Sequence, residues 1–493
     1  MNIAPPPQAI FDALIVGSGA GGCAAAYKLA TAGLRVALIE KGNALPRDSS
    51  TLDFHKVVHQ GLFKSREQWS DRIGARFAPE EHFNLGGKTK WYGAALLRYG
   101  RHEFAPDPSH QCLGWPFGYD ELEPYYEEAE KLLGVRVFDV EPDLVRIVSR
   151  LNAKTWQSLP LPLSLDAGIT HNRLEASRFD GFASVANLKG DGETAFLSKL
   201  RGRSNFTLIT GDAVVDLLGD PASPRRITGV RLKDGREFHG RSVLLAAGAL
   251  HSPRLLQRYL NAAGVADELQ SADAIGRYLK LHLLTAVVAI SASLKTDLIR
   301  KTAILVNDGL PHSSIQPLGF DGELIGTLVP MLAPRWTAKL IGSRAYGFFL
   351  QTEDGAHRDN RVYDADHRGE TPPVLDYDAA RSIAALQEHT NLIRQFRRSL
   401  AGAGMLAFSQ RIGIAGTAHA SGTLTAGTDP ASSVVGADGR VHGLDSLYVV
   451  DGSVLPRSSR VNPSLTIYAW SLRVSQLLAA SLQGVTAARA VLS

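Results

Sequence analysis

Three glycines near the start of the chain have the spacing of a dinucleotide-binding turn. Gly17, Gly19 and Gly22 form the pattern G-x-G-x-x-G. In such a turn the first glycine permits a tight bend, the second lets the backbone approach a pyrophosphate, and the third lets a helix pack closely on a strand. The helix that follows offers free N–H groups and a positive dipole end to the phosphates. The pattern predicts a dinucleotide site, and by itself it does not distinguish FAD from NAD.

The segments around these glycines have the periodicity of a strand–turn–helix–strand unit. Phe11–Val16 is a short apolar run suited to a buried parallel strand, and Cys23–Thr31 suits a helix that stops at Gly33. Leu34–Ile39 suits a second buried strand, which ends at Glu40. A carboxylate at that point can accept hydrogen bonds from an adenosine ribose. This order of elements supports the dinucleotide site more strongly than the glycines alone.

Elements farther along the chain are predicted from periodicity and turn chemistry. Tyr119–Leu133 has the pattern of an acidic amphipathic helix with Asp120 as its N-cap. Alternating strands follow residue 205, with a hairpin turn at Lys233–Arg236 and a last apolar strand at Val243–Ala247. Tyr377–Leu400 suits another helix. The periodicity of residues 140–190 is too weak to assign elements there.

Composition excludes several classes of function. The 493 residues carry 53 basic and 49 acidic side chains, and a net charge of +4 without a dense basic tract argues against nucleic-acid binding. Cys23 and Cys112 are the only cysteines, so a disulfide framework is excluded and no metal site is predicted. The first residues lack a signal-peptide pattern, and no run approaches the roughly 18 apolar residues of a membrane span. We therefore expect a soluble cytoplasmic protein.

Three blocks of sequence resemble the glucose–methanol–choline (GMC) oxidoreductase family, whose members bind FAD. They occur in the family's order along the chain, and the third is the most specific, with its His-Ala-Ser-Gly-Thr start, an Asp-Gly pair and an Asn-Pro pair. The blocks are Asn84–Gly93, Leu244–Pro253 and His419–Asn462, the last running on to Thr466. The resemblance implies oxidation of a CH–OH group of an alcohol or sugar, by hydride transfer to flavin N5. Molecular oxygen, a quinone or an external redox partner would then accept the electrons.

The resemblance also implies a fold and a division of the chain. The expected fold is α/β, a Rossmann-like FAD-binding domain of GMC type with an interleaved α+β substrate-binding domain on an antiparallel sheet. Residues 1–115, 191–285 and 405–493 would form the FAD-binding domain. Residues 116–190 and 286–404 would form the substrate-binding domain.

The family places a His/Asn or His/His pair on the substrate side of the flavin, and His419 and Asn462 occupy these positions. Hydride removal from a carbinol carbon is easier when a base takes the hydroxyl proton, and a neutral imidazole suits that task. An amide cannot take the proton, but it can orient the hydroxyl group. We therefore expect His419 to be the base and Asn462 its partner. Asn462 also precedes Pro463 and an apolar helical run, so it is a candidate N-cap.

The remaining cofactor contacts are expected where this sequence matches the family's motifs. Asp451 and Gly452 would contact the ribityl and pyrophosphate region, and the backbone of Val214 would contact adenine. The predicted FAD-binding residues are Gly17, Gly19, Ala20, Gly22, Glu40, Lys41, Gly87, Thr89, Tyr92, Gly93, Val214, Ala247, Gly248, Asp451, Gly452, Asn462 and Pro463.

Some positions depart from the family's pattern. Trp91 occupies the slot where some members attach FAD through a histidine, so we expect non-covalent FAD, although His82 and His102 lie nearby in the sequence. Arg457 and Arg460 replace small residues before Asn462. One or both could bind an anionic substrate, although ordinary surface or ion-paired arginine is the simpler interpretation.

Two other functions are compatible with the same motifs. A lyase related to the hydroxynitrile lyases of this family would use His419 as an acid and base without net redox turnover. A dehydrogenase subunit would depend on an external cytochrome, because the chain has no C-x-x-C-H motif for haem attachment.

Overall fold

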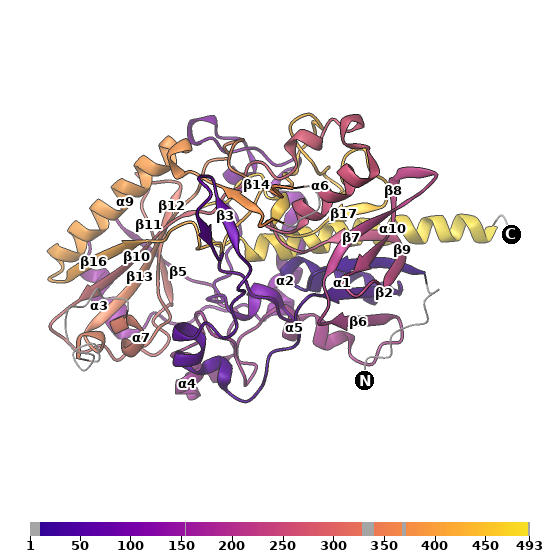
Figure 1. The fold of residues 1–493 in the computed structure, drawn as a ribbon. Coiled ribbons are helices and arrows are strands. Elements are labelled where there is room, and N and C mark those ends of the chain that lie inside the picture. The colour runs from indigo at the N-terminus through magenta and orange to yellow at the C-terminus, as the bar shows by residue number, and fades with distance from the viewer. Residues whose placement is uncertain (1–9, 153, 328–339, 367–370, 492–493) are drawn as a thin grey trace.

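The computed structural model describes residues 10–152, 154–327, 340–366 and 371–491 of the chain. Two large sheets lie side by side, with connecting segments between them (Figure 1). Each sheet has its own apolar core, and the polar residues of interest lie between the two.

The first sheet has seven strands in the order β6-β2-β1-β9-β8-β7, with β17 paired to β9. Its strands are β1 (Phe11–Val16), β2 (Val36–Glu40), β6 (Phe206–Thr210), β7 (Val214–Asp220), β8 (Ser223–Leu232), β9 (Glu237–Leu245) and β17 (Leu447–Val449). The pairs β1–β2, β1–β9, β2–β6 and β9–β17 are parallel, while β7, β8 and β9 form an antiparallel meander. The apolar run of β1 is buried almost throughout, as expected for a central parallel strand.

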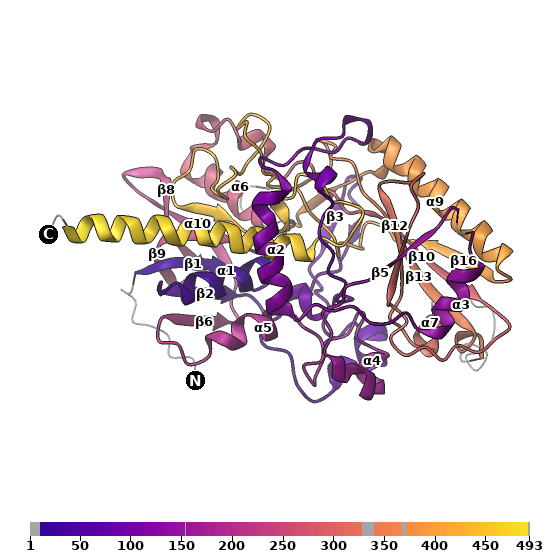
Figure 2. The ribbon, with the colours of Figure 1, turned by 180° about the vertical axis from the view of Figure 1, so that it is seen from behind.

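Three helices pack beside this sheet: α1 (Ala20–Thr31), α2 (Tyr119–Leu133) and α10 (Ser464–Val491). The small residues of α1 allow close approach, and the Ser471 hydroxyl of α10 donates to the Gly21 carbonyl at 2.6 Å. The Tyr126 hydroxyl of α2 lies 2.8 Å from the Thr466 hydroxyl of α10. From behind, α2 crosses α10, which carries the chain out past the edge of the sheet (Figure 2).

The second sheet is antiparallel, with six strands in the order β16-β10-β13-β12-β11-β5. Its strands are β5 (Gln157–Pro160), β10 (Leu283–Ile290), β11 (Ala303–Val306), β12 (Ser313–Pro317), β13 (Ala345–Thr352) and β16 (Leu406–Arg411). Helix α9 (Ile383–Gly402) covers one face, because Leu392, Phe396 and Leu400 recur every fourth residue and form an apolar stripe. The opposite face therefore remains available to the segments between the sheets.

Smaller elements complete the described chain. A four-stranded sheet contains β3 (Trp69–Asp71), β4 (Arg76–Phe77), β14 (Arg361–Tyr363) and β15 (Val374–Asp376). The other α-helices are α3 (Pro142–Arg150), α4 (Arg173–Ala176), α5 (Gly192–Ala195), α6 (Ser252–Ala263) and α7 (Gly322–Thr327). Two single-turn helices adjoin the site, η3 (Gly87–Lys90) and η11 (Gly452–Val454).

The structure confirms the α/β fold and the opening strand–turn–helix–strand unit, and it corrects details of three helix starts. Helix α1 begins at Ala20 rather than Cys23. Gly118, not Asp120, is the N-cap of α2, and Asp120 lies in the first turn. Helix α9 starts at Ile383 rather than Tyr377, because Asp378 caps a separate turn at Ala379–Arg381. The domain division stays a prediction, although β16 pairs within the second sheet and α2 packs against α10.

Candidate active site

The carboxyl ends of five parallel strands meet at one edge of the first sheet. Gly17 follows β1, Glu40 ends β2, and Ala246 follows β9, while Gly211 and Val450 follow β6 and β17. In open α/β sheets, ligands bind in the crevice outside the carboxyl ends of the strands. This edge therefore provides the expected place for a dinucleotide.

The three motif glycines have different surroundings. Gly17 has a φ of +101°, and a Cβ there would overlap the Ala246 carbonyl. A Cβ on Gly22 would overlap the Gly17 carbonyl, so these two glycines permit the close packing of β1, α1 and β9. A Cβ on Gly19 would meet no protein atom within 4 Å. Gly19, just before α1, thus faces open space. The unpaired N–H groups at the start of α1, which begins at Ala20, could bind a pyrophosphate there.

Glu40 keeps capacity for a further hydrogen bond. Its Oε2 accepts the N–H and the hydroxyl of Ser18 at 2.9 and 2.6 Å, and its Oε1 accepts the N–H of Gly42 at 2.9 Å. Burial raises the pKa of Glu40, and the Ser18 and Gly42 hydrogen bonds oppose that shift. A carboxylate has about four acceptor positions, so one remains for a ribose hydroxyl. Lys41 lies beside Glu40, with its ammonium 3.7 Å from the centre of the Phe83 ring.

The segment after β6 borders the end of the crevice where adenine is expected. The Gly211 N–H donates to the carbonyls of Glu40 and Gly42, both at 3.1 Å. Val214 begins β7 shortly after this turn and is partly exposed. The predicted Val214 contact thus lies on a segment that is bonded directly to the end of β2.

The double-glycine loop crosses above the motif turn. A Cβ on Gly87 would lie 3.0 Å from the Gly19 Cα, and the Gly86 N–H donates to the Ser18 hydroxyl at 3.1 Å. The buried Thr89 hydroxyl donates to the Gly86 carbonyl at 2.5 Å and accepts the Gly192 N–H at 2.9 Å. Thr89 therefore holds the loop in place through protein contacts.

Tyr92 and Gly93 continue this loop toward the second sheet. The Tyr92 hydroxyl donates to the Gly190 carbonyl at 2.6 Å. Gly93 packs against the ion pair of Lys301 and Asp180, and a Cβ there would overlap both side chains. Gly93 thus lies between the expected cofactor crevice and the Lys301–Asp180 ion pair.

Asp451 joins the ends of two parallel strands. Its Oδ2 accepts the Gly248 N–H at 2.8 Å and the Ser252 hydroxyl at 2.5 Å, and its Oδ1 accepts the Ser453 N–H at 2.9 Å. Burial raises the pKa of Asp451, while these hydrogen bonds oppose that shift. The carboxylate is bonded within the protein, so the backbone of Asp451 and Gly452 is what this turn offers to a cofactor. Ala247 is held in the same way, through its N–H to the Ser252 hydroxyl at 3.1 Å.

The two predicted catalytic side chains lie together. The Asn462 Nδ2 is 3.4 Å from the His419 Nε2. The Gln316 Nε2 of β12 donates to the Asn462 Oδ1 at 2.6 Å, which leaves the NH₂ group of Asn462 facing His419. Asn462 is not the N-cap of α10, because that helix begins at Ser464 and the amide is bonded to Gln316 and His419 instead. Pro463 accepts the Ile467 N–H at 3.0 Å through its carbonyl.

Two contacts bring His419 to the cofactor crevice. The Lys88 ammonium of the double-glycine loop donates to the Thr417 carbonyl at 2.9 Å. The Gly422 N–H donates to the Gly452 carbonyl at 3.1 Å. The segment that carries His419 is therefore bonded on one side to the double-glycine loop and on the other to the Gly452 backbone, both of which are expected to border the flavin.

A second histidine, which the sequence did not reveal, contacts the first. The Nδ1 atoms of His282 and His419 are 3.0 Å apart, with the rings nearly perpendicular at 79°. The His282 Nε2 lies 2.7 Å from the Ser459 carbonyl oxygen. His282 stands alone between apolar residues just before β10, 137 positions from His419 in the chain, so no local spacing links the two.

The surroundings keep His419 neutral. Burial lowers its pKa well below the ordinary value. The nearby Lys301 and Lys88 lower it further, as a protonated His282 would. Both lysines are ion-paired: Lys301 lies 2.8 Å from Asp180, and Lys88 lies 2.5 Å from Glu81. An unprotonated imidazole is the form that can accept a proton.

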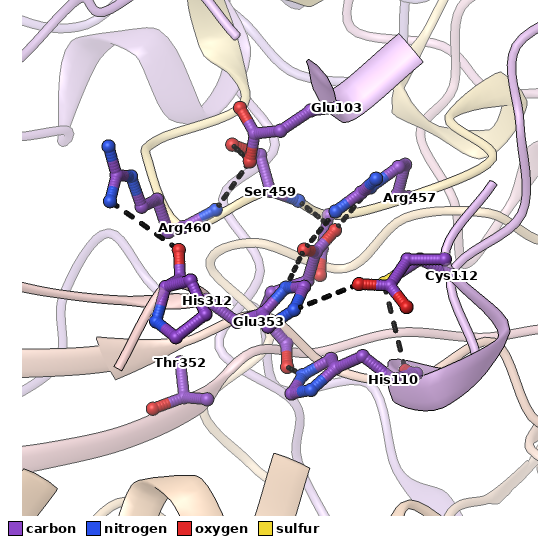
Figure 3. A network of polar contacts seen from close by, with 12 residues as sticks. Glu103, His110, Cys112, His312, Thr352, Glu353, Arg457, Ser459 and Arg460 are labelled. Carbon is purple, nitrogen blue, oxygen red and sulfur yellow. Dashed lines mark hydrogen bonds and ion pairs between the residues drawn. The ribbon is translucent and has the colours of Figure 1, made fainter. Parts of the chain in front are cut away.

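Arg457 and Arg460, the two candidate substrate contacts, are both bonded within the protein. Arg457 is 2% exposed, and its Nε and Nη2 donate to the Glu353 carboxylate at 2.9 and 2.6 Å (Figure 3). Its Nη1 donates to the Ala105 carbonyl at 3.0 Å. This agrees with the simpler interpretation of Arg457 as an ion-paired arginine, and it gives no support to a substrate contact there. The Arg460 guanidinium is bonded to the Pro311 carbonyl at 3.4 Å, which gives no support to a substrate contact there.

A cluster of possible metal ligands lies near Arg457. His110, His312 and Glu388 offer ligand atoms within 4.8 Å of one another. However, the His312 Nδ1 is 2.9 Å from Glu353 and its Nε2 is 3.2 Å from Asp107. Burial alone would lower the pKa of His312, but its contact with Glu353 outweighs burial and raises it. An imidazolium between two carboxylates accounts for this arrangement.

No helix in the described ranges combines the length and the apolar character that a bilayer crossing requires.

Comparisons with known proteins agree with this geometry. A family profile described as GMC oxidoreductase matches residues 356–471, and one described as FAD dependent oxidoreductase matches residues 12–170. The chain is 29% identical to the paromamine 6'-oxidase of Streptomyces fradiae, over 96% of this chain and 92% of that protein. It is 26% identical to a 5-(hydroxymethyl)furfural oxidase of Methylovorus sp., over 92% and 96%. A formate oxidase structure from Aspergillus oryzae has the same fold, with a TM-score of 0.68 at 14% identity over 97% of this chain and 99% of that one.

Proposed function

We propose that this chain, which belongs to the GMC oxidoreductase family and is an FAD-dependent oxidoreductase of CH–OH groups, oxidises an alcohol or sugar. In this proposal His419 is the base and Asn462 is its orienting partner. The observation that supports these two roles is the position of the His419 Nε2 beside the Asn462 NH₂ group, on a segment bonded to Gly452.

The residues of the crevice fit FAD. The start of α1 at Gly19 and Ala20 would hold the pyrophosphate, and Glu40 would hold the ribose. Gly87 and the Asp451–Gly452 backbone would border the ribityl chain and the ring. When bound, the flavin supplies the acceptor of the hydride and its two electrons.

The side chains of this protein would handle the hydroxyl proton. The His419 Nε2 takes the proton from the substrate hydroxyl as the carbonyl double bond forms, which lowers the barrier to loss of hydride from the carbinol carbon. The Asn462 Nδ2 donates to the substrate oxygen and fixes the direction of the carbinol C–H bond. The names of two relatives, which specify a paromamine 6' position and a hydroxymethyl group, support an alcohol or sugar as the donor.

Anaerobic flavin reduction tests this proposal. Alcohols and amino sugars should bleach the yellow flavin band of the wild type, and His419→Ala should slow the bleaching by roughly 10²–10⁴-fold with FAD still bound. His239→Ala, which changes an exposed histidine on β9, is the control and should bleach like wild type. Normal bleaching in the His419→Ala enzyme would refute the base assignment.

The same experiment separates the remaining alternatives. Product formation without bleaching would indicate a lyase. Rapid return of the colour after air is admitted would identify an oxidase, whereas slow return would indicate a dehydrogenase that uses a quinone or an external partner.

We also propose that FAD is held without a covalent bond. Trp91 donates from its indole N–H to the Asn84 side-chain oxygen at 2.9 Å, and the His82 ring stacks on it at 4.7 Å. His102 is exposed at the surface. Acid denaturation should therefore release the yellow colour into the supernatant, and colour retained in the precipitate would contradict this.

A further inference from the structure

We propose that His282 is a positioning residue that determines which nitrogen of His419 carries the proton. This inference rests on the proposed function, because it explains how the base of that function keeps its lone pair on the nitrogen facing the substrate. It follows from three hydrogen bonds in series, from the Ser459 carbonyl to His282, to His419 and to Asn462.

The Ser459 carbonyl fixes the proton of His282. A carbonyl oxygen can only accept, so the His282 Nε2, 2.7 Å away, must be the protonated donor. His282 is 4% exposed, and burial lowers its pKa, so its ring is neutral. A neutral imidazole protonated at Nε2 has its lone pair at Nδ1. The His282 Nδ1 is therefore an acceptor.

The proton of His419 follows from that of His282. Two neutral rings meet through their Nδ1 atoms at 3.0 Å, and one of the two must donate. Because the His282 Nδ1 accepts, the His419 Nδ1 carries the hydrogen, and the His419 Nε2 is left with its lone pair. This lone pair faces the Asn462 NH₂ group at 3.4 Å, which is the side from which a hydroxyl proton would arrive.

Two buried carboxylates hold Ser459, the residue whose carbonyl starts this series. Glu353 accepts the Ser459 N–H at 2.8 Å, and Glu103 accepts the Ser459 hydroxyl at 2.6 Å. Glu103 also accepts the Arg460 N–H at 3.2 Å (Figure 3). Because the Ser459 carbonyl is bonded to His282, the peptide between Ser459 and Arg460 is bonded at both its N–H and its C=O. Ser459 has a φ of +65°, a strained conformation for a non-glycine residue. The Ser459 carbonyl therefore has little freedom to turn away from His282.

The same series accommodates the charge that proton transfer creates. When the substrate hydroxyl proton moves to the His419 Nε2 and the hydride leaves to FAD, His419 becomes a cation. Its Nδ1–H then makes a charge-assisted bond to the neutral His282, which is stronger than a bond between neutral rings. Glu353 and Asp354 lie behind His282 and favour positive charge there, while Lys301 and Lys88 oppose it near His419.

Two amide substitutions at His282 separate its two hydrogen bonds. The Oδ1 of His282→Asn lies near the position of the imidazole Nδ1 and can still accept from His419. The Nε2 of His282→Gln lies near the imidazole Nε2 and can still donate to Ser459, but it leaves His419 without its acceptor. Asparagine also tolerates the φ of +62° at this position. His282→Leu removes both bonds.

We expect flavin reduction in His282→Asn to stay within about threefold of wild type. His282→Gln and His282→Leu should slow it by about 10- to 100-fold, which is part of the roughly 10²–10⁴-fold that a general base supplies. The acid limb of the pH–rate profile should move to lower pH in the Gln and Leu variants only, because the imidazolium of His419 loses its acceptor. Flavin absorbance and thermal unfolding show whether each variant folds and retains FAD.

Nitrogen NMR of protein with isotope-labelled histidine measures the tautomer directly, with His419→Gln used to assign the signal. Wild type and His282→Asn should show an unprotonated Nε2 at His419, and His282→Gln should show a mixture of tautomers. Equal rates and equal tautomers in the Asn and Gln variants would overturn the inference, provided that His419→Ala is slow. Normal reduction in His419→Ala would instead overturn the proposed function, and the NMR signal would still decide the role of His282.

Discussion

The two halves of the site are built by different means. On the cofactor side, backbone geometry forms the crevice: Gly17 and Gly22 are required for packing, and Gly19 leaves space open. On the substrate side, side chains form the site: Gln316, Asn462, His419 and His282 are linked by successive hydrogen bonds. The glycine motif of the first half is close in sequence, although the strands that pack around it are not. The second depends on residues from separate parts of the chain.

This difference determines what a substitution can damage. A side chain added in the crevice should block the cofactor and leave the fold intact if it points into open space. A side chain changed in the hydrogen-bonded series should leave the cofactor bound and change the rate or its pH dependence. The following predictions test that separation.

The largest effect is expected from Gly19→Val. The added side chain meets no protein atom at its Cβ, so the apoprotein should fold with wild-type thermal stability. It would occupy the space assigned to the pyrophosphate, so FAD retention should be lost entirely. The ratio of flavin to protein absorbance after desalting measures this.

Gly22→Val is the matched control for that experiment. A Cβ at Gly22 overlaps the Gly17 carbonyl, so this variant should lose thermal stability as well as FAD. A yellow, fully loaded Gly19→Val protein would show that the crevice is not where FAD binds.

An effect of about tenfold is expected from Gln316→Leu. Gln316 is buried and orients the Asn462 amide, so its loss should slow flavin reduction while FAD stays bound. Gln351→Leu is a matched control, because Gln351 is equally buried on the adjacent strand and its side-chain amide donates to the Arg460 carbonyl at 2.6 Å instead of to Asn462. Equal rates in the two variants would mean that the orientation of Asn462 does not limit the reaction.

The sequence predicted the opening unit of the first sheet well, because the signals of that unit are local. Strand, glycines, helix and acid lie within residues 11–40, and the structure confirms their order. His419 and Asn462 were found through motifs, but their supports were not. Gln316 lies on β12 and His282 just before β10, and neither position carries a spacing that links it to residue 419. A hydrogen bond between distant segments leaves no periodic trace in one sequence.

Arg457 shows the same limit for a charged residue. Next to a predicted catalytic asparagine it was compatible with either an anionic substrate or an ion pair, and its partner Glu353 lies 104 residues away on another segment. Only the folded chain shows that the charge is already neutralised and that the pair supports the Ser459 backbone through Glu353. The sequence shows that Arg457 is positively charged, but it does not show which acidic residue pairs with it.

The smallest predicted effect is a shift in pH dependence on the substrate side. Burial is the main reason that the pKa of His419 is low, and the Lys301 charge lowers it further. The double substitution Lys301→Met with Asp180→Asn removes that charge without leaving a lone carboxylate buried. The pKa of His419 should then rise.

The direction of the change follows from the proposed role of His419. A base works unprotonated, so flavin reduction should be lost as the pH falls through the pKa of His419, and a higher pKa should move this acid limb to higher pH. Reduction by the double variant should therefore be slower than wild type at mildly acidic pH and equal to it on the alkaline plateau. Stopped-flow reduction across the pH range measures both. A lower plateau with an unmoved limb would show that Lys301 and Asp180 contact the substrate rather than tune the histidine, and the substrate half would then extend to the wall beside Gly93.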